Sequence, residues 1–323
     1  MVDQIDLSIS IVNTSNWKYL KPCLESIYQN IKDISFEILV VDNVSDDGSD
    51  EYIQKLFPDV MLSINNERYG FAKNNNINIE KANGRHILLL NDDTLVLPNS
   101  LEKAVNFLDK NPDVGIVGCK MISPNGDYQD ASARRFKSLF SEFLIETGIN
   151  RRIHIFDVST NQSKKYFEID LPSEAGMIIS RNVFNKIGFL DEQFFMYGEG
   201  ADWCLRVKKE GYKIIYLSDC PIIHFGGTTN NRTSLKMFLQ LYKSKYLLFN
   251  KYNKIEAFLY KHLIIELFWI KLILQKFFLI NKKNYKDDDL SNNLIYYQKL
   301  IDLFINRLED HTYPFPYKKL SND

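Results

Sequence analysis

The residues best suited to chemistry are two adjacent carboxylates, Asp92 and Asp93, which stand at the end of an apolar run of strand length that begins at residue 86. A continuous Ile/Leu run bounded by polar residues is typical of a strand buried on both faces of a parallel sheet. Such sheets bind their ligands at the carboxyl ends of the strands. Carboxylates at that edge can bind a hard divalent cation, which can in turn bind a diphosphate. A solvated turn or a helix cap explains the same two residues equally well.

A second apolar run, at residues 36–41, also ends in a carboxylate. Asp42 and Asn43 follow it directly, and a turn rich in Gly, Ser and Asp comes next. A carboxylate at this position can accept the imide N–H of uracil or thymine, and Asn43 could reach the ribose. Asp42 can instead cap the next helix, which is a common role for aspartate. The two similar strand ends together favour a binding site over two unrelated turns.

Strand-like and helix-like segments alternate along the first third of the chain, and they must position these residues. The expected strands cover residues 7–12, 36–41, 60–64, 86–90 and 114–119, and the expected helices cover residues 17–30, 50–56, 70–81 and 98–110. This order predicts an open, mainly parallel α/β sheet flanked by helices. Residues 120–172 are polar and lack a clear pattern. Regular signals return with strands at 174–180 and 213–217 and a helix at 199–210.

From residue 233 onward the pattern is helical and rich in Leu, Ile, Phe, Tyr and Lys. Charged residues interrupt the segment 255–280, so no apolar run reaches the ~18–20 residues that a transmembrane helix needs. Two interpretations stay open for this segment: a packed helical subdomain, or helices that lie on an anionic membrane with their lysines near the headgroups. We therefore divide the chain into a domain at residues 1–230 and a helical extension at residues 231–323.

Composition limits the class of protein. A chain of 323 residues with 45% hydrophobic content can bury a large core. The formal net charge of −1 provides no general attraction to nucleic acid. Four widely spaced cysteines without a Cys-x-x-Cys pair argue against a zinc cluster and for reduced, mostly buried thiols. The N-terminal residues lack the features of a secretory signal. These features together predict a cytoplasmic protein that does not bind nucleic acid.

A series of short motifs occurs in order along most of the predicted first domain. They are Ser-Ile-Val (10–12), Val-Val-Asp-Asn (40–43), Gly-Phe-Ala-Lys-Asn-Asn-Asn (70–76), Leu-Asn-Asp-Asp-Thr (90–94), Glu-Ala-Gly-Met-Ile-Ile-Ser-Arg (174–181), Gly-Phe-Leu-Asp-Glu-Gln-Phe-Phe-Met-Tyr (188–197), Asp-Trp-Cys-Leu-Arg (202–206) and Ile-Ile-His (222–224). Through these motifs, residues 5–227 resemble the family 2 inverting glycosyltransferases of the GT-A fold. Within that family the chain is most similar to bacterial rhamnosyltransferases of surface-polysaccharide synthesis.

The resemblance implies that the chain binds a nucleotide-sugar donor together with a divalent cation, Mn²⁺ or Mg²⁺. The implied donor-binding residues are Val12, Asp42, Asn43, Arg68, Gly70, Asn76 and Asp92. Asp93 takes the last position of the family's Asp-x-Asp-like motif and is the implied metal ligand, with His224 as a second ligand. The cation would neutralise the charge that builds on the diphosphate leaving group. An imidazole ligand suits Mn²⁺ better than Mg²⁺.

Three arginines are candidates for the acceptor side: Arg134 and Arg135, in the region where an acceptor loop is expected, and Arg206, at the end of its motif. A basic pair would suit a lipid-diphosphate acceptor, although charged pairs on protein surfaces are usually solvated. Arg68 stands where the family has an asparagine. Its guanidinium can pair with the diphosphate, or it can be an ordinary surface arginine.

The sequence departs from the family at the residue that should act as general base. In the family this base is the Asp of a Glu-Asp pair, in a pattern like Tyr-x-Glu-Asp-x-Asp-x-Cys-x-Arg. Here the corresponding residues are Glu199 and Gly200. Three explanations stay open: Glu199 or Asp202 supplies the base, the acceptor is activated in another way, or the chain is a disabled transferase that still binds its donor. Asp202 is four residues from Arg206 and can instead pair with it on a helix.

The sequence therefore predicts an inverting glycosyltransferase that moves a hexose or deoxyhexose from a dTDP- or UDP-sugar to a hydroxyl of a cell-surface, lipid-linked glycan intermediate. We expect it in the cytoplasm, and peripheral contact with the inner face of the cell membrane through its C-terminal helices is one of the two interpretations that stay open. The alternative is a catalytically disabled, nucleotide-sugar-binding partner in a polysaccharide assembly complex. A nucleotidyltransferase is disfavoured because residues 13–16 are not a Gly-rich phosphate loop.

Overall fold

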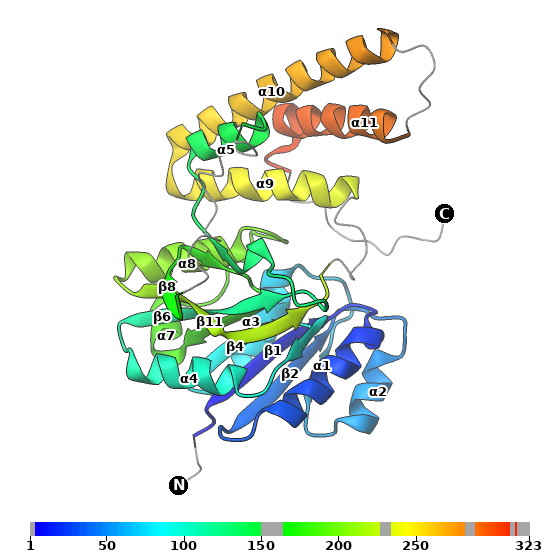
Figure 1. Cartoon of the computed structure of the whole chain (residues 1–323). Coiled ribbons are helices and arrows are strands. Elements are labelled where there is room, and N and C mark those ends of the chain that lie inside the picture. The colour runs from blue at the N-terminus through cyan, green and yellow to red at the C-terminus, as the bar shows by residue number, and fades with distance from the viewer. Residues whose placement is uncertain (1–3, 150–163, 227–233, 282–287, 311–313, 315–323) are drawn as a thin grey trace.

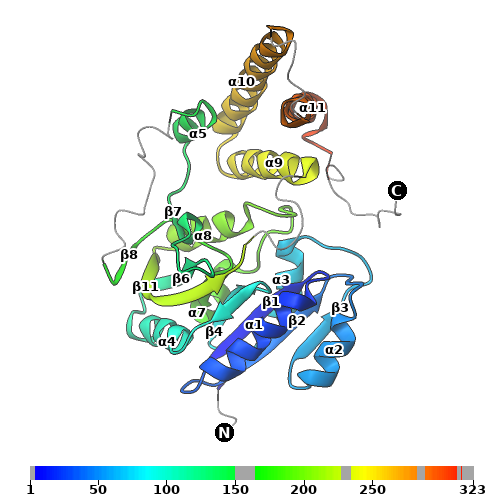
Figure 2. The same cartoon turned by 45° about the vertical axis from the view of Figure 1, so that its right-hand side comes forward.

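The computed structural model describes residues 4–149, 164–226, 234–281, 288–310 and 314. Helices cover both faces of a β-sheet, and a layer of further helices lies across one end of the molecule in both views (Figures 1 and 2). The predicted α/β fold with a C-terminal helical extension is confirmed.

The strands have the following bounds: β1 (Leu7–Asn13), β2 (Phe36–Asp42), β3 (Met61–Ile64), β4 (His86–Asn91), β5 (Thr94–Val96), β6 (Val114–Ile122), β7 (Ala133–Arg134), β8 (Tyr166–Glu168), β9 (Leu171–Pro172), β10 (Gly176–Ser180) and β11 (Lys213–His224). The helices are α1 (Trp17–Asn30), α2 (Ser49–Leu56), α3 (Phe71–Lys81), α4 (Ser100–Lys110), α5 (Leu139–Glu146), α7 (Arg181–Ile187), α8 (Glu199–Lys209), α9 (Leu235–Tyr252), α10 (Lys254–Asn281) and α11 (Asp288–Asp302). Two short helices, η1 (Asp130–Ser132) and η3 (Leu303–Arg307), complete the described elements.

The direction of each strand in the main sheet decides which residues share an edge. The order is β3-β2-β1-β4-β10-β6-β11-β5, with β8 also paired to β11. The first four strands are parallel, β10 runs antiparallel between β4 and β6, and β6 and β11 are parallel to each other. The carboxyl ends of β1, β2, β4, β6 and β11 therefore lie at one edge. Because β10 runs the other way, its amino end lies at that same edge.

The apolar runs form strands because both faces of the sheet are covered. Side chains alternate between the two faces of a strand. In β4, Leu88 and Leu90 enter the core cluster on the side of α1 and α4, whereas Ile87 and Leu89 enter the cluster on the side of α3, α7 and α8. This arrangement explains the continuous apolar run that the sequence shows. All four cysteines are buried and free, as the sequence predicts.

The structure differs from the predicted elements mainly where local patterns are weak. The patternless region 120–172 contains the end of β6, the strands β7, β8 and β9, and α5, while residues 150–163 lie outside the described part. β11 continues to His224 instead of ending at residue 217, since an irregularity between Leu217 and Pro221 interrupts its apolar pattern without ending the strand. α4 begins at Ser100 after Asn99, so Pro98 precedes the helix instead of starting it.

The helical layer has a core of its own, formed by α9, α10 and α11. α10 buries Tyr260, Ile264, Phe268 and Leu272, which recur every four residues on one face. α5 also belongs to this layer. Lys245 Nζ lies 2.7 Å from Glu142 Oε2, and Lys271 Nζ lies 2.9 Å from Glu146 Oε2. The layer therefore includes a segment that precedes the predicted boundary at residue 231. None of the described helices is both long and apolar enough to cross a membrane.

A buried carboxylate, Asp202, joins α8 to the end of α9. Its side chain is fully buried, and Arg206 donates to Oδ2 from Nε at 2.9 Å. Tyr252 donates to Oδ1 at 2.8 Å, and Lys251 Nζ lies 2.5 Å from the same oxygen. The pairing with Arg206 that the spacing allowed is present, and both carboxylate oxygens are occupied.

We predict that Asp202→Asn lowers the free energy of unfolding by about 3 kcal/mol, because it leaves two cations without their shared anion. The value is at the low end for a buried ion pair, since Arg206 and Lys251 keep partial solvent contact. Denaturant unfolding followed by circular dichroism measures the change. Asp113→Asn, which breaks an exposed pair with Lys213, is the matched control and should leave stability unchanged. Equal effects of the two substitutions would contradict the assigned role of Asp202.

Candidate active site

The strand-end residues predicted from the sequence meet at one edge of the sheet. Asp42 is the last residue of β2 and pairs in register with Asn13 on β1. Val12 on β1 pairs with Asn91, the last residue of β4. The short strand β5, which begins just after the two acids, pairs its Thr94 with His224. Segments from four distant parts of the chain therefore converge here.

Asp93 and His224, the two predicted metal ligands, face each other. His224 Nε2 lies 3.3 Å from Asp93 Oδ1, and both side chains are almost fully buried. His224 Nδ1 lies 2.8 Å from Gln129 Oε1, an atom that can only accept. Nδ1 therefore carries the proton in the neutral ring, so the lone pair of Nε2 points toward the carboxylate. An imidazole lone pair beside a carboxylate oxygen is a ligand set that fits a divalent cation.

Gln129 was not identified from the sequence, because it lies in the region without a clear pattern. Its Nε2 also donates to the backbone oxygen of His224, at 2.6 Å, so Gln129 holds both the imidazole and the backbone of that residue. A hydrogen-bonding partner of this kind orients a metal-binding histidine. Among the described residues, no three His, Cys, Asp or Glu side chains gather around one possible metal position. The protein therefore offers a two-residue set that needs other ligands to complete it.

Asp92 adds a second buried carboxyl group to the same turn. It is buried, and its Oδ2 has no hydrogen-bond partner among the described residues. Burial, followed by the negative charge of Asp93, raises the pKa of Asp92 to about 8. A buried carboxyl group with this environment favours a nearby positive charge.

The other strand-end residues hold the turns of the site in place. Asp42 accepts hydrogen bonds from Asn13 Nδ2 at 3.0 Å, Ser49 Oγ at 3.1 Å and the backbone N–H of Ser45 at 2.9 Å. Asn43 binds the backbone of Tyr69 through both ends of its amide, at 2.9 and 3.1 Å. Asp42 and Asn43 are predicted to bind the nucleoside. In the structure, their side chains hold the loops that follow β2 and precede α3 in place.

The Gly-Phe-Ala-Lys-Asn-Asn-Asn motif binds the loop that leads into α8. A Cβ atom at Gly70 would lie 2.2 Å from the backbone oxygen of Phe195, so only glycine fits there. Asn76 donates to the oxygen of Leu190 at 2.9 Å and accepts from its N–H at 3.0 Å. Arg68, just before this motif, is exposed. Gly70 and Asn76 therefore position α8, while Arg68 is open to solvent.

A second pair of carboxylates, Glu199 and Glu174, lies at the start of α8. Glu199 is 1% exposed, and its Oε2 has no hydrogen-bond partner among the described residues. Burial, followed by the charge of Glu174, raises the pKa of Glu199 well above its usual value. Burial also raises the pKa of Glu174, whose carboxylate accepts the backbone N–H of Gly200. Glu174 is part of a sequence motif, but nothing local to it marked it as a site residue.

The side chains of the three arginines predicted for the acceptor side have different partners. Arg206 holds Asp202 and donates to the backbone oxygens of Ile187 and Phe189. Arg135 lies on the surface, 3.6 Å from Asp170. Arg134 bonds the oxygen of Pro172 at 3.2 Å, and its positive charge acts on both Glu174 and Glu199. Of the three, Arg134 is the one placed beside the carboxylate pair.

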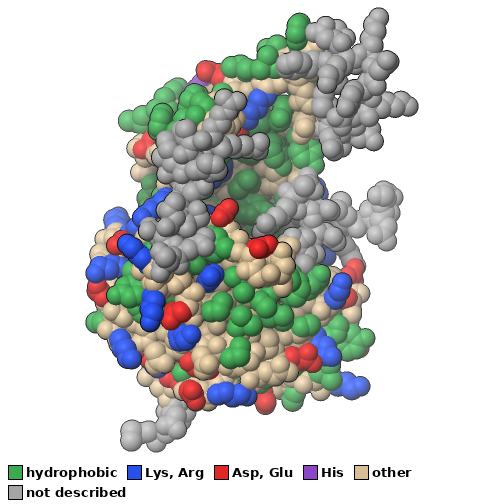
Figure 3. All heavy atoms as spheres, viewed as in Figure 1, with side chains coloured by type: hydrophobic (Ala, Val, Ile, Leu, Met, Phe, Trp, Pro, Cys, Tyr) green, Lys and Arg blue, Asp and Glu red, His purple; other side chains and the backbone are tan. Residues whose placement is uncertain are grey.

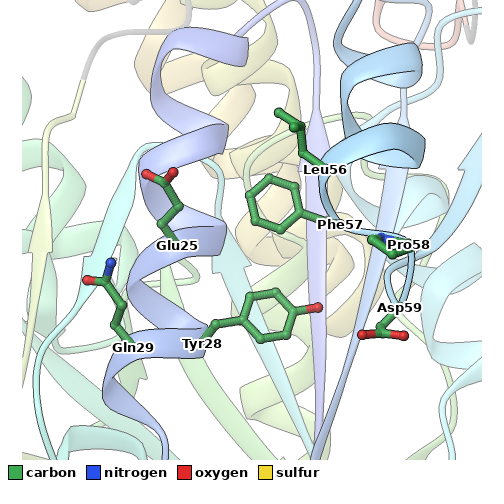
Figure 4. Close-up of a pocket in the computed structure, with 7 residues that line it drawn as sticks. All are labelled: Glu25, Tyr28, Gln29, Leu56, Phe57, Pro58 and Asp59. Carbon is green, nitrogen blue, oxygen red and sulfur yellow. The ribbon is translucent and has the colours of Figure 1, made fainter.

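A surface hollow of about 330 Å³ lies elsewhere, between α1 and the end of α2 (Figure 4). Its lining includes Tyr28, whose ring packs against Phe36 at the start of β2. A second hollow, of about 440 Å³, is lined by His86 and Val114 at the starts of β4 and β6. Both hollows therefore open near the amino ends of parallel strands. Asp93 and His224 lie at the opposite edge of the sheet, where these strands end.

The sequence model of the family Glycosyl transferase family 2 matches residues 8–188 of the chain. The matched segment runs from Ser8 in β1 past β4 and includes the turn with the two acids. The chain belongs to this family. The match ends before Glu199 and His224.

Relatives and solved structures agree with this assignment. The rhamnosyltransferase WbbL of Escherichia coli is 26% identical over 250 residues, which cover 74% of this chain and 90% of that protein. The N-acetylglucosaminyl-diphospho-decaprenol L-rhamnosyltransferase of Mycobacterium tuberculosis is 25% identical over 230 residues. The aligned region covers 65% of this chain and 73% of that protein. The hexosyltransferase Agl10 of Haloferax volcanii is 24% identical, and the chain spans 66% of it. These likenesses are distant.

A solved structure with a similar fold is that of the mannosyltransferase PcManGT from Pyrobaculum calidifontis in complex with GDP-Man and Mn²⁺. It superposes with a TM-score of 0.55 at 16% identity, over 93% of this chain and 88% of that one. The likeness shows that the chain has the GT-A fold of such transferases.

We predict that Gln129→Leu weakens Mn²⁺ binding by about 10- to 100-fold, because the imidazole of His224 loses the partner that orients it. Calorimetric titration with Mn²⁺ measures the change. Gln29→Leu, at an exposed position on α1, is the matched control and should bind Mn²⁺ as the parent does. Unchanged Mn²⁺ affinity in Gln129→Leu would contradict the role of Gln129 in orienting a metal-binding His224.

Proposed function

We propose that the chain is a metal-dependent inverting glycosyltransferase that moves a hexose or deoxyhexose from a dTDP- or UDP-sugar to a hydroxyl of a cell-surface glycan intermediate. The observation that carries this proposal is the convergence of Asp92, Asp93 and His224 at one edge of the sheet in a member of glycosyl transferase family 2. Relatives named as rhamnosyltransferases support a deoxyhexose donor.

The donor would lie across the carboxyl ends of β1, β2 and β4. Asp42 and Asn43 border the nucleoside in this arrangement, with Val12 on β1 beside them. Gly70 and Asn76 keep the opposite wall in place, and the exposed Arg68 can swing onto the diphosphate. Asp92 and Asp93 then lie at the diphosphate, where two carboxylates require a cation between them and the phosphates.

Asp93 and His224 would hold Mn²⁺ or Mg²⁺, with phosphate oxygens and water as the remaining ligands. The cation would neutralise the charge that develops on the departing diphosphate. Gln129 keeps the proton of His224 on Nδ1 and leaves Nε2 free to bind. The mannosyltransferase with GDP-Man and Mn²⁺ supports this use of the fold.

Inversion requires the acceptor hydroxyl to attack the anomeric carbon from the face opposite the diphosphate. A carboxylate on that face takes the hydroxyl proton, typically for a gain of ~10²–10⁴-fold. Glu199 keeps an oxygen without a partner, whereas Asp202 has both oxygens occupied by Arg206, Lys251 and Tyr252. The carboxylate pair at the start of α8 is therefore the proposed base site, with Arg134 beside it on the acceptor side.

We further propose that α10 contacts the inner face of the cell membrane, which would bring the enzyme to a lipid-linked acceptor. Figure 3 shows hydrophobic side chains, in green, on the helical layer at the top of the molecule. Along α10, large hydrophobic side chains are exposed on the face opposite its buried one. They are Ile255, Phe258, Leu259, Trp269, Ile270, Ile273, Leu274 and Phe277. Such a stripe, with lysines nearby, suits a helix that lies in a membrane surface. The lipid-linked substrate in the name of the M. tuberculosis relative supports this proposal.

The function is tested by nucleoside-diphosphate release from dTDP-, UDP- and GDP-sugars, with a synthetic lipid-diphosphate sugar as acceptor. We expect release from a dTDP- or UDP-sugar that stops when a chelator removes the metal. Asp93→Asn should lower turnover by about 100-fold or more, because several kcal/mol of charge stabilisation depend on the cation. Tight donor binding without release would instead support the alternative of a disabled partner protein.

The membrane proposal is tested by sedimentation with vesicles that contain anionic lipid. Replacing Phe258, Ile273 and Phe277 together by serine should abolish most of the binding, because it removes apolar area that would enter the membrane surface. Leu56→Ser and Ile64→Ser, at exposed positions near the far edge of the sheet, are the controls and should bind normally. Equal sedimentation of both sets would refute a membrane-binding role for α10.

A further inference from the structure

Gly200 stands where the family's motif has its catalytic aspartate, and the structure shows no room for a side chain there. A Cβ atom at Gly200 would lie 1.9 Å from Glu174 Oε1 and 2.6 Å from Glu174 Cδ. Real Cβ atoms do not approach other atoms so closely. The space in which an aspartate side chain would begin is therefore filled by a carboxylate that comes from another segment of the chain.

Glu174 reaches this space because of the direction of β10. It lies two residues before Gly176, which pairs with Leu90 near the carboxyl end of β4. Since β10 and β4 are antiparallel, the chain before Gly176 runs alongside the chain after Leu90, toward Asp92 and Asp93. Glu174 therefore lies at the same edge of the sheet as the predicted diphosphate site, as a base must.

We propose that Glu174 is the general base of sugar transfer and that Gly200 is a glycine because it must admit the Glu174 carboxylate. This inference rests on the proposed function. The acceptor oxygen forms its bond to the anomeric carbon as its proton passes to a carboxylate oxygen of Glu174. The bond between the anomeric carbon and the diphosphate breaks at the same time, and its electron pair leaves with the diphosphate.

The surroundings divide the roles of the two glutamates. Glu199 is 1% exposed, whereas Glu174 as a whole residue keeps partial exposure to solvent. Burial raises the pKa of both glutamates, and the charge of Glu174 adds to the rise at Glu199. The positive charge of Arg134 opposes the effect of burial on the pKa of Glu174 and so favours its ionised form.

A purely structural role for Glu174 makes a different prediction. Its carboxylate accepts the Gly200 N–H in the first turn of α8, where an acceptor stabilises a helix. A glutamine at 174 can also accept this hydrogen bond, but it cannot take a proton from a hydroxyl. The substitution Glu174→Gln therefore separates the capping role from the role in proton transfer.

We expect Glu174→Gln to lower kcat by about 10²–10⁴-fold, the usual contribution of a general base, with unchanged donor affinity and unchanged thermal unfolding. Glu25→Gln, at a partly exposed position on α1, is the matched control and should keep the parent's kcat. The double variant Glu174→Gly/Gly200→Asp moves the carboxylate from one segment to the other. Its kcat should be about tenfold or more above that of Glu174→Gln.

Two results would overturn the inference while the proposed function stands. One is a kcat of Glu174→Gln within about threefold of the parent. The other is a gain in kcat from Gly200→Asp alone, which would place the active carboxylate at position 200. A parent chain that neither binds nor cleaves any donor of the panel would instead refute the proposed function, and the role of Glu174 with it. Donor affinity, measured by calorimetry, distinguishes these cases.

Discussion

The cost of burying negative charge governs the functional edge of this protein. Asp92, Asp93 and Glu199 are almost fully withdrawn from water there, and Glu174 lies against Glu199. A buried carboxylate without a cation or hydrogen bonds is expensive, so each must be neutralised, paired or protonated. Asp202 and Arg206 show the paired solution, whereas Asp92 and Glu199 show raised pKa values. Asp92 lies at the proposed diphosphate site, and Glu199 lies beside Glu174, the proposed base.

The rest of the molecule keeps these acids in place. Buried amides hold the loops of the site. Asn43, which follows β2, binds the backbone of Tyr69, and Asn76 on α3 binds the backbone of Leu190. Asp202 anchors the start of α8 to the end of α9, so the position of Glu199 depends on the helical layer as well as on the sheet. α5 packs into that layer through Glu142 and Glu146. A carboxylate held on rigid elements keeps its geometry through the reaction.

Much of this architecture could be predicted because each strand and each strand-end acid is recognised from residues that are neighbours in the sequence. Apolar runs such as 36–41 and 86–90 indicate strands buried on both faces, and an acid directly after such a run lies at the sheet edge whatever the remainder of the fold. The resemblance to the family implied Asp93 and His224 as metal ligands, and the structure places their side chains 3.3 Å apart. The elements of residues 120–172 were not, because β7, β8 and β9 are two or three residues long and carry too few alternations to form a pattern.

The sequence by itself determined the α/β order, the two strand-end acids and the family, since all three are recorded in local runs and ordered motifs. Only the tertiary structure decided that Gln129 supports His224, that α5 joins the C-terminal helices and that Glu174 fills the space beside Gly200. These contacts join segments that are distant along the chain. They follow from the direction of β10 and from the packing of helices on the sheet, which local patterns do not encode.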